Sequence, residues 1–390
     1  MPGYPRTQAA QGIHDDPEAI MLLIKSNGTE ILFVSVDVVI VTKDRADRLR
    51  ELISRKNKIP KNQIFVEATH THSGPSGFDT MIKIPDDNEN SQFFNWSIKK
   101  IQESVNQLRE NMQQVSAEIC ETTSQGFYSN RIDARKKYNN KIWILNFVNS
   151  EDETIAGMLN INVHSTVVGP ENTWISKDLI GSIRETCYQE LGVLYYAFPG
   201  ACGDVSNRHN RQGNDFAELS RVVKGITNQI IDAKEFKKIT MDYQQIEAFS
   251  YVIDYDNQTN FPAYHESLTR IESILNAPET LSFDEIKLKK SEKSALESKL
   301  MTKHVHMDVK MVKIDFGEIV LITFPGELSS KLGEIVADSY APEIALILGY
   351  TNDFHMYFME KELYGKTYET IASLVPEGEP EKIVERMSKI

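Results

Sequence analysis

Short apolar runs alternate with longer amphipathic segments along most of this chain, and this alternation limits the folds open to it. Residues 31–41 and 63–69 are apolar enough to be buried strands, and residues 43–56 between them have helical spacing. Further strands are expected at 142–147, 154–163, 193–198, 305–316, 318–324 and 344–348, and further helices at 91–113, 176–191 and 215–234. The sequence therefore predicts an α/β fold with a central mixed, mostly parallel β-sheet flanked by helices on both faces, an α/β/α sandwich.

Residues 263–303 interrupt this alternation. They are rich in Glu, Lys, Leu and Ser, and Asn276-Ala277-Pro278 breaks the segment near its middle. This pattern predicts a helical hairpin with a solvated, charged face.

The charge balance argues against two classes of partner. The 43 basic and 56 acidic residues give a formal net charge of −13, which opposes binding to nucleic acid and to anionic membranes. The three cysteines form no Cys-x-x-Cys pair, as expected in a reducing compartment. No run of about 18 apolar residues predicts an integral membrane segment. We therefore expect a cytoplasmic protein, although a start site further upstream could add a secretion signal.

Two histidines follow a predicted buried strand. His70 and His72 come directly after the apolar run 64–66, and a Ser-Gly-Pro turn follows at 73–75. At strand spacing both imidazoles would point to the same side, which could place a metal and a proton-transfer group near one substrate. Taken alone, this pair is more often a polar strand end without a function.

Four other predicted strand ends carry polar residues. Asn162-Val163-His164 closes one strand, where a hydrogen-bonded histidine and a metal ligand are both consistent with the sequence. Small residues lead to Ser206 after another, and a helix start carries the carboxylate of Glu327 after a third. A polar, aromatic loop spans 349–357. Because chemistry gathers where strands end in such sheets, these segments are expected to lie close together.

Taken in order, these motifs resemble those of the neutral/alkaline, non-lysosomal ceramidases, especially the shorter bacterial forms that keep only the catalytic domain. The resemblance spans nearly the whole chain and rests on Gly12-Ile13-His14, the Thr69 to Pro75 run, Asn130-Arg131, Asn162-Val163-His164, Gly203-Asp204-Val205-Ser206, Pro325-Gly326-Glu327, and Gly349-Tyr350 through Tyr357. It implies one catalytic domain over 1–390, with a helical insertion at about 263–303 and without the C-terminal immunoglobulin-like domain of full-length members.

The resemblance implies one catalytic zinc ion per chain, held by His70, His164, Glu327 and Tyr357. Neutral imidazoles and a carboxylate suit Zn²⁺, and an open position would let the metal lower the pKa of a bound water to about 7. A phenolate is a rarer ligand. If Tyr357 does not bind the metal, it would instead donate a hydrogen bond to the oxyanion of the reaction.

The resemblance also implies four catalytic residues. His72 is expected to shuttle a proton or to hydrogen-bond the developing oxyanion, and Tyr368 could donate to the same oxygen. Arg131 is expected to orient a carbonyl or hydroxyl of the substrate. Ser206 is expected to contact the substrate or to act as a nucleophile, and the contact role is preferred because the metal site already provides a nucleophile. For His14 and Asp37, which border the same motifs, a structural role is favoured.

The function implied is that of a zinc-dependent amidohydrolase cleaving the amide bond of a small-molecule or lipid N-acyl substrate, ceramide-like or smaller. One departure concerns the substrate, because this chain has Asn207-Arg208 where the family usually continues with Pro-Asn after the motif serine. Two alternatives stay open. One is a metal-retaining binding protein without turnover, and the other is a zinc hydrolase of esters or lactams.

Overall fold

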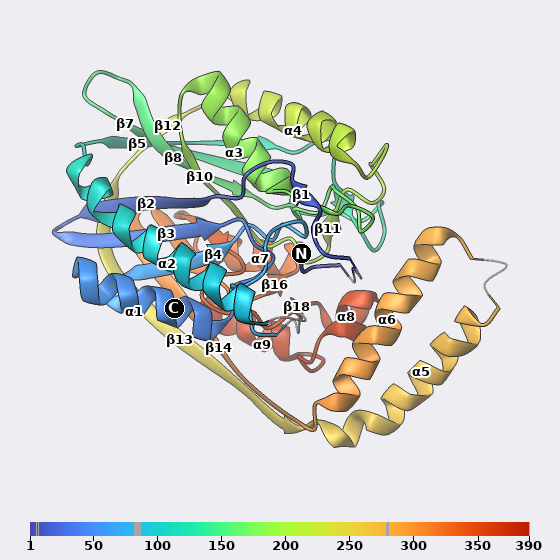
Figure 1. Cartoon of the computed structure of the whole chain (residues 1–390). Coiled ribbons are helices and arrows are strands. Elements are labelled where there is room, and N and C mark those ends of the chain that lie inside the picture. The colour runs from blue at the N-terminus through green and yellow to red at the C-terminus, as the bar shows by residue number, and fades with distance from the viewer. Residues whose placement is uncertain (5, 7, 82–86, 278–280, 390) are drawn as a thin grey trace.

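The computed structural model describes residues 1–4, 6, 8–81, 87–277 and 281–389. Within these residues the chain folds into four layers, with two β layers packed face to face between two layers of helices (Figure 1). The fold therefore combines α and β elements as expected, but its sheets are arranged differently from the prediction.

The first β layer contains two sheets side by side. One is β2 (Ala19–Ser26), β3 (Thr29–Val36) and β4 (Ile64–Ala68), and the other has the order β10 (Tyr195–Pro199), β8 (Thr154–Ile161), β7 (Lys141–Val148), β5 (Ser116–Thr123) and β12 (Lys237–Ile239). Ser35 Oγ of β3 donates to Ala197 O of β10 at 3.4 Å. Alternate residues of both sheets face opposite cores, as strand geometry requires.

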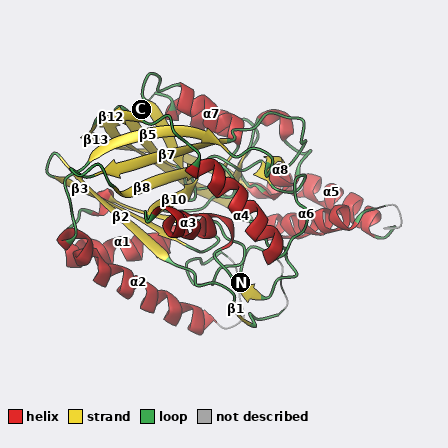
Figure 2. Cartoon of the chain, turned by 90° about the horizontal axis from the view of Figure 1, so that it is seen from above, coloured by secondary structure: helices red, strands yellow, loops and turns green. Residues whose placement is uncertain are grey.

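Helices cover one face of this layer, and the second β layer covers the other. The helices are α1 (Lys43–Asn57), α2 (Asp87–Glu110), α3 (Asp178–Leu191) and α4 (Phe216–Ile231), seen together in Figure 2. The second β layer has the order β13 (Met241–Asp256), β14 (His304–Gly317), β15 (Ile319–Thr323) and β17 (Ile344–Leu348). Its far face packs on α7 (Ser330–Asp338) and α9 (Glu379–Met387).

A single, mostly parallel sheet is not confirmed. In the larger sheets of the described chain, the pairs β3–β4, β8–β10 and β15–β17 are parallel, and the other pairs are antiparallel. The sequence could not distinguish these arrangements, because an apolar run shows only that a strand is buried. A strand with both faces covered is apolar throughout, whether a helix or a second sheet covers it and whichever way its neighbour runs.

The 263–303 segment contains two helices, α5 (Phe261–Leu275) and α6 (Phe283–Met301), placed between the long strands β13 and β14. They project from one end of the molecule (Figures 1 and 2). Ser282 begins α6 with a capping box that it shares with Glu285. Pro278, part of the expected break, lies outside the described residues. The strand β13 was not expected from the sequence.

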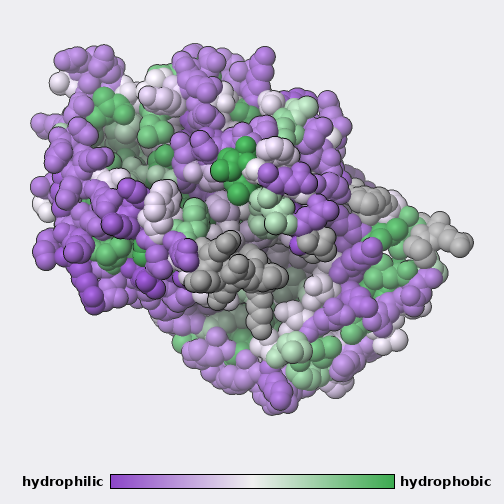
Figure 3. Space-filling view, viewed as in Figure 1, coloured by the Kyte–Doolittle hydropathy of each residue, from purple (hydrophilic) through white to green (hydrophobic). Residues whose placement is uncertain are grey.

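The face shown in Figure 3 is largely hydrophilic, with small separate hydrophobic groups, and it is hollowed between the body and the α5–α6 hairpin. None of the helices in the described part of the chain is long and apolar enough to cross a membrane.

Short elements lie where the larger strands end. Three two-stranded pairs are β1 (Gly12–Ile13) with β9 (Trp174–Ile175), β6 (Ser129–Asn130) with β11 (Val205–Ser206), and β16 (Glu327–Leu328) with β18 (Tyr357–Phe358). The remaining short elements are the helix α8 (Tyr368–Ala372) and the 3₁₀ turns η1 (Lys61–Gln63), η2 (Asn257–Asn260) and η4 (Lys361–Leu363). Most of the motif residues from the sequence are on or beside these pairs.

Candidate metal centre and active site

His70 lies just beyond β4, which ends at Ala68, and has a positive φ of 61°. The expectation that His70 and His72 share one face of a strand is therefore wrong, because the chain turns at His70. The turn nevertheless brings the two Nε2 atoms to 3.2 Å from each other. The His70 ring stacks on Tyr350 at 4.3 Å, and its Nδ1 lies 2.7 Å from the carbonyl oxygen of Val39.

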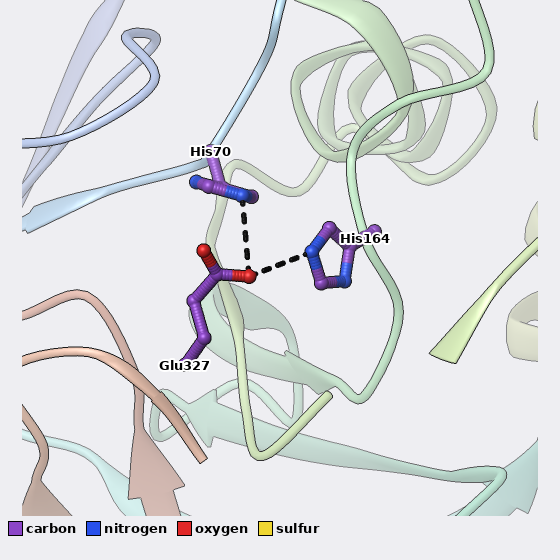
Figure 4. A group of neighbouring side chains, drawn as sticks. All are labelled: His70, His164 and Glu327. Carbon is purple, nitrogen blue, oxygen red and sulfur yellow. Dashed lines mark hydrogen bonds and ion pairs between the residues drawn. The ribbon is translucent and has the colours of Figure 1, made fainter. Parts of the chain in front are cut away.

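His164 and Glu327 complete a buried group with His70. His164 follows β8, and its Nδ1 lies 2.8 Å from the carbonyl oxygen of Cys202. Glu327 opens β16, and its Oε2 lies 2.9 Å from His164 Nε2 and 3.7 Å from His70 Nε2. The three side chains point toward one another (Figure 4), and each is at most 3% exposed. All three ligand atoms lie within 4.8 Å of one another, so the group could hold a metal ion.

The protonation of this group supports a cation at its centre. Each Nδ1 faces a carbonyl oxygen and must donate to it, so each Nε2 carries a lone pair. Burial lowers the pKa of His70 to about 4 and that of His164 to about 3, and it raises the pKa of Glu327. Two ligands of one tetrahedral zinc lie about 3.3 Å apart, between the two N–O distances here. The donor set therefore fits zinc.

In metal-free protein, His164 is expected to make folding sensitive to acid. Burial lowers its pKa to about 3, whereas an unfolded histidine binds a proton near pH 6.5. As the pH falls below 6.5, the free energy of unfolding should therefore fall by about 1.4 kcal/mol per pH unit until the pH approaches 3. Urea denaturation of chelator-treated wild type and His164→Gln between pH 6 and 4 should show a shallower slope in the variant by about this amount. Equal slopes would contradict a neutral, buried His164.

His72 lies beside this group without belonging to it. Burial, followed by the neighbouring His70, keeps the pKa of His72 well below its usual value, so the ring is neutral at pH 7. Its Nδ1 is buried and has no hydrogen-bond partner among the described residues. The N-terminal segment covers the ring, since Tyr4 packs edge-on at 4.8 Å and Arg6 Nη1 donates to the His72 carbonyl oxygen at 2.7 Å.

Arg131 places a buried cation at the same centre. Its Nη1 lies 3.3 Å from His164 Nε2, and its Nε pairs with Glu369 Oε1 at 2.7 Å. Burial alone would lower the pKa of Arg131, but Glu369, Tyr357 and Glu327 outweigh it, so the pKa is raised and the charge is kept. Sequence reasoning missed Glu369, although it directly follows the predicted Tyr368.

Two tyrosines border the carboxylate. In the parallel pairing of β16 with β18, Tyr357 lies directly beside Glu327. Burial, followed by Glu327, holds the pKa of Tyr357 well above its usual value, and burial raises the pKa of Tyr368 to about 12. The two rings are 6.0 Å apart and nearly perpendicular. Both phenols are therefore protonated and able to donate hydrogen bonds in the metal-free protein.

The remaining residues singled out from the sequence lie further from the metal ligands. Ser206 is buried on β11, and its Oγ accepts from Arg208 N at 3.3 Å; within the described residues it bonds no histidine. His14 is half exposed and stacks on Phe216. Asp37, just beyond β3, accepts hydrogen bonds from Thr69 beside β4 and from Arg184 of α3.

The comparison with known families identifies the N-terminal half. Residues 1–192 match the family model described as neutral/alkaline non-lysosomal ceramidase, N-terminal. The chain belongs to this family. Membership in the neutral/alkaline ceramidases confirms the resemblance seen in the sequence and the expected class of enzyme, a ceramidase-like hydrolase of amide bonds.

Solved structures support the fold of this ceramidase-family chain over its whole length. Neutral ceramidase from Pseudomonas aeruginosa matches with a TM-score of 0.68 at 16% identity, covering 97% of this chain and 68% of that chain. A structure described as ceramidase complexed with C2 matches with a TM-score of 0.70 at 15% identity, covering 98% and 70%. At this identity the likeness shows the fold alone. Among curated proteins, none matches the chain.

Proposed function

We propose that this protein is a zinc-dependent amidohydrolase that cleaves the amide bond of an N-acyl substrate, ceramide-like or smaller. The observation that carries the proposal is the buried group of His70, His164 and Glu327, whose lone pairs converge beside His72 and Arg131. Amide hydrolysis needs an activated water, donors for the developing oxyanion and a proton for the leaving amine. The side chains around the group can serve each need.

His70, His164, Glu327 and Tyr357 would hold the zinc, which supplies a Lewis acid for the amide carbonyl and lowers the pKa of a water to about 7. His72 supplies a proton donor. Because His70 Nδ1 donates to a carbonyl, His70 Nε2 accepts, so the 3.2 Å contact requires the proton on His72 Nε2. When His70 Nε2 is used as a ligand, that N–H is released to hydrogen-bond the oxyanion. For proton transfer, His72 Nδ1, which has no partner among the described residues, would first take a proton from the attacking water, and the imidazolium would then give its Nε2 proton to the leaving amine.

Arg131 orients the substrate in this proposal. Its Nη2 is buried and finds no hydrogen-bond partner among the described residues, so it can receive a carbonyl or hydroxyl oxygen. Glu369 pairs with the guanidinium through Nε. Tyr368, with a protonated phenol, donates to the same region, and Ser206 contacts the substrate without acting as a nucleophile, since no base lies on its Oγ within the described residues.

Elemental analysis combined with an amine-release assay tests this function. The purified protein should contain one zinc per chain and release free amine from at least one member of a panel of short and long N-acyl amides that includes a ceramide. A chelator should stop the reaction and added zinc should restore it. The preferred acyl length then defines the substrate class.

Matched esters and lactams serve as the comparison set in the same assay. Zinc with cleavage of esters or lactams but of no amide would replace the amidohydrolase by another zinc hydrolase. Zinc without any cleavage would favour a binding role, and protein without metal would remove the proposed centre.

A further inference from the structure

The segment 202–204, here called the joint, contacts several parts of the centre through its backbone. The carbonyl oxygen of Cys202 receives the Nδ1–H of His164 at 2.8 Å. The N–H of Gly203 donates to the second residue of β16 at 2.8 Å. A methyl group on Gly203 would lie only 2.7 Å from the carbonyl oxygen of Glu327, so glycine is needed for this close approach. The joint therefore holds two of the three metal-ligand candidates against each other.

The third member of the joint, Asp204, reaches β6 and the start of α7 with its side chain. Its Oδ1 accepts from Ser330 N at 2.6 Å, and its Oδ2 accepts from Ser330 Oγ at 2.9 Å and from Asn130 Nδ2 at 2.7 Å. Its carbonyl oxygen also accepts from Arg131 N at 2.7 Å. Ser330 begins α7 three residues after the β16 carboxylate, so Asp204 ties β16 and β6 to the joint.

We propose that Asp204 is a positioning residue that sets Glu327 and Arg131 at their places beside His164. The inference rests on the proposed function, because it assumes that these residues act on a bound metal and substrate. Asp204 is buried, and three hydrogen bonds occupy both of its oxygens. Hydrogen bonds to a carboxylate are about twice as strong as those between neutral groups, so the three bonds define one arrangement of the two strands.

The geometry requires a carboxylate rather than an amide at this position. The Oδ1 of Asn130 accepts from Ile132 N at 3.0 Å and from Asp133 N at 3.2 Å. These bonds fix the orientation of the Asn130 amide, so its Nδ2 must donate toward Asp204. An asparagine at position 204 would turn its own N–H₂ group toward the N–H₂ of Asn130 or toward Ser330 N, and two donors cannot hydrogen-bond each other. The hydrogen bond from Asn130 or from Ser330 N would therefore be lost.

Asp204→Ala and Asp204→Asn test the proposal in full-length protein, with zinc and cobalt binding as readouts besides activity. Asp204→Ala should weaken zinc binding 10- to 100-fold, the usual effect of losing an outer partner of a metal site. It should also alter the visible absorption of the Co²⁺-loaded protein and lower kcat with little change in KM. Asp204→Asn should show smaller changes of the same kind, because it keeps the hydrogen bond from either Asn130 or Ser330 N.

Asp215→Ala is the matched control. Asp215 also receives a backbone N–H at a helix start, that of Glu218 at 3.0 Å, but it begins α4. This variant should lose some thermal stability, as the removal of a helix cap does, while keeping wild-type zinc affinity and the wild-type cobalt spectrum. If Asp204→Ala behaves like this control, Asp204 is a structural residue only and the proposal is overturned.

Two further outcomes separate this inference from the proposed function. Should Asp204→Ala fail to fold, Asp204→Asn carries the test, and a wild-type cobalt spectrum with wild-type kcat in that variant overturns the positioning role. Wild-type protein that binds zinc but releases no amine contradicts the proposed function, while the cobalt spectra still decide on Asp204. Wild-type protein that binds neither metal overturns both.

Discussion

Replacing His70 or His164 by alanine is expected to remove zinc from the purified protein and to reduce amine release to background. Zinc binding by four protein ligands provides about 10–16 kcal/mol, so a single ligand carries roughly 3 kcal/mol, more than a hundredfold in Kd. Elemental analysis after dialysis measures the result directly.

His304→Ala is the control for these two variants. His304 is exposed on β14 and pairs with Asp254, so its loss removes an imidazole without touching the centre. Circular dichroism and thermal unfolding should show all three variants folded. A full equivalent of zinc retained by His70→Ala would make the ligand assignment wrong.

The sequence was informative about where strands and helices lie but not about how strands pair. The runs that became β15 and β17 are apolar at every position except Thr323, and both faces of each strand are buried. Such a run says that both faces are covered, yet it cannot distinguish a covering helix from a second sheet. The long strand β13 escaped prediction for the opposite reason, because most of its residues are partly or fully exposed.

The candidate centre could be assembled from the sequence only through the family resemblance. His70, His164 and Glu327 are far apart in the chain, and each strand end alone is at least as consistent with a simple polar terminus. Their convergence depends on how the ends of β4 and β8 meet the short pair β16–β18, and no local sequence pattern indicates this arrangement. The sequence did not assign roles to Glu369 and Asp204. These two residues are distinguished by their burial, and a sequence does not show whether a carboxylate is buried or exposed.

His72→Ala is expected to keep the metal and lose turnover, by a factor of about 10² to 10⁴, the usual contribution of a positioned proton-transfer group. The ring lies beside the three ligand candidates rather than among them, and its Nε2–H is the donor released when His70 binds metal. Zinc content should therefore stay at one per chain and KM should change little, while kcat falls.

The His72→Gln variant distinguishes the two roles proposed for His72, which are hydrogen bonding to the oxyanion and proton transfer to the amine. The glutamine amide can still donate a hydrogen bond to an oxyanion, but it cannot give up a proton to a leaving amine. Activity well above that of His72→Ala would therefore assign hydrogen bonding as the main role, and equal activity in both variants would assign proton transfer. Zinc lost from either variant would place His72 among the ligands instead. Undiminished kcat in His72→Ala would remove it from the mechanism and leave Arg131 and the two tyrosines as the donors.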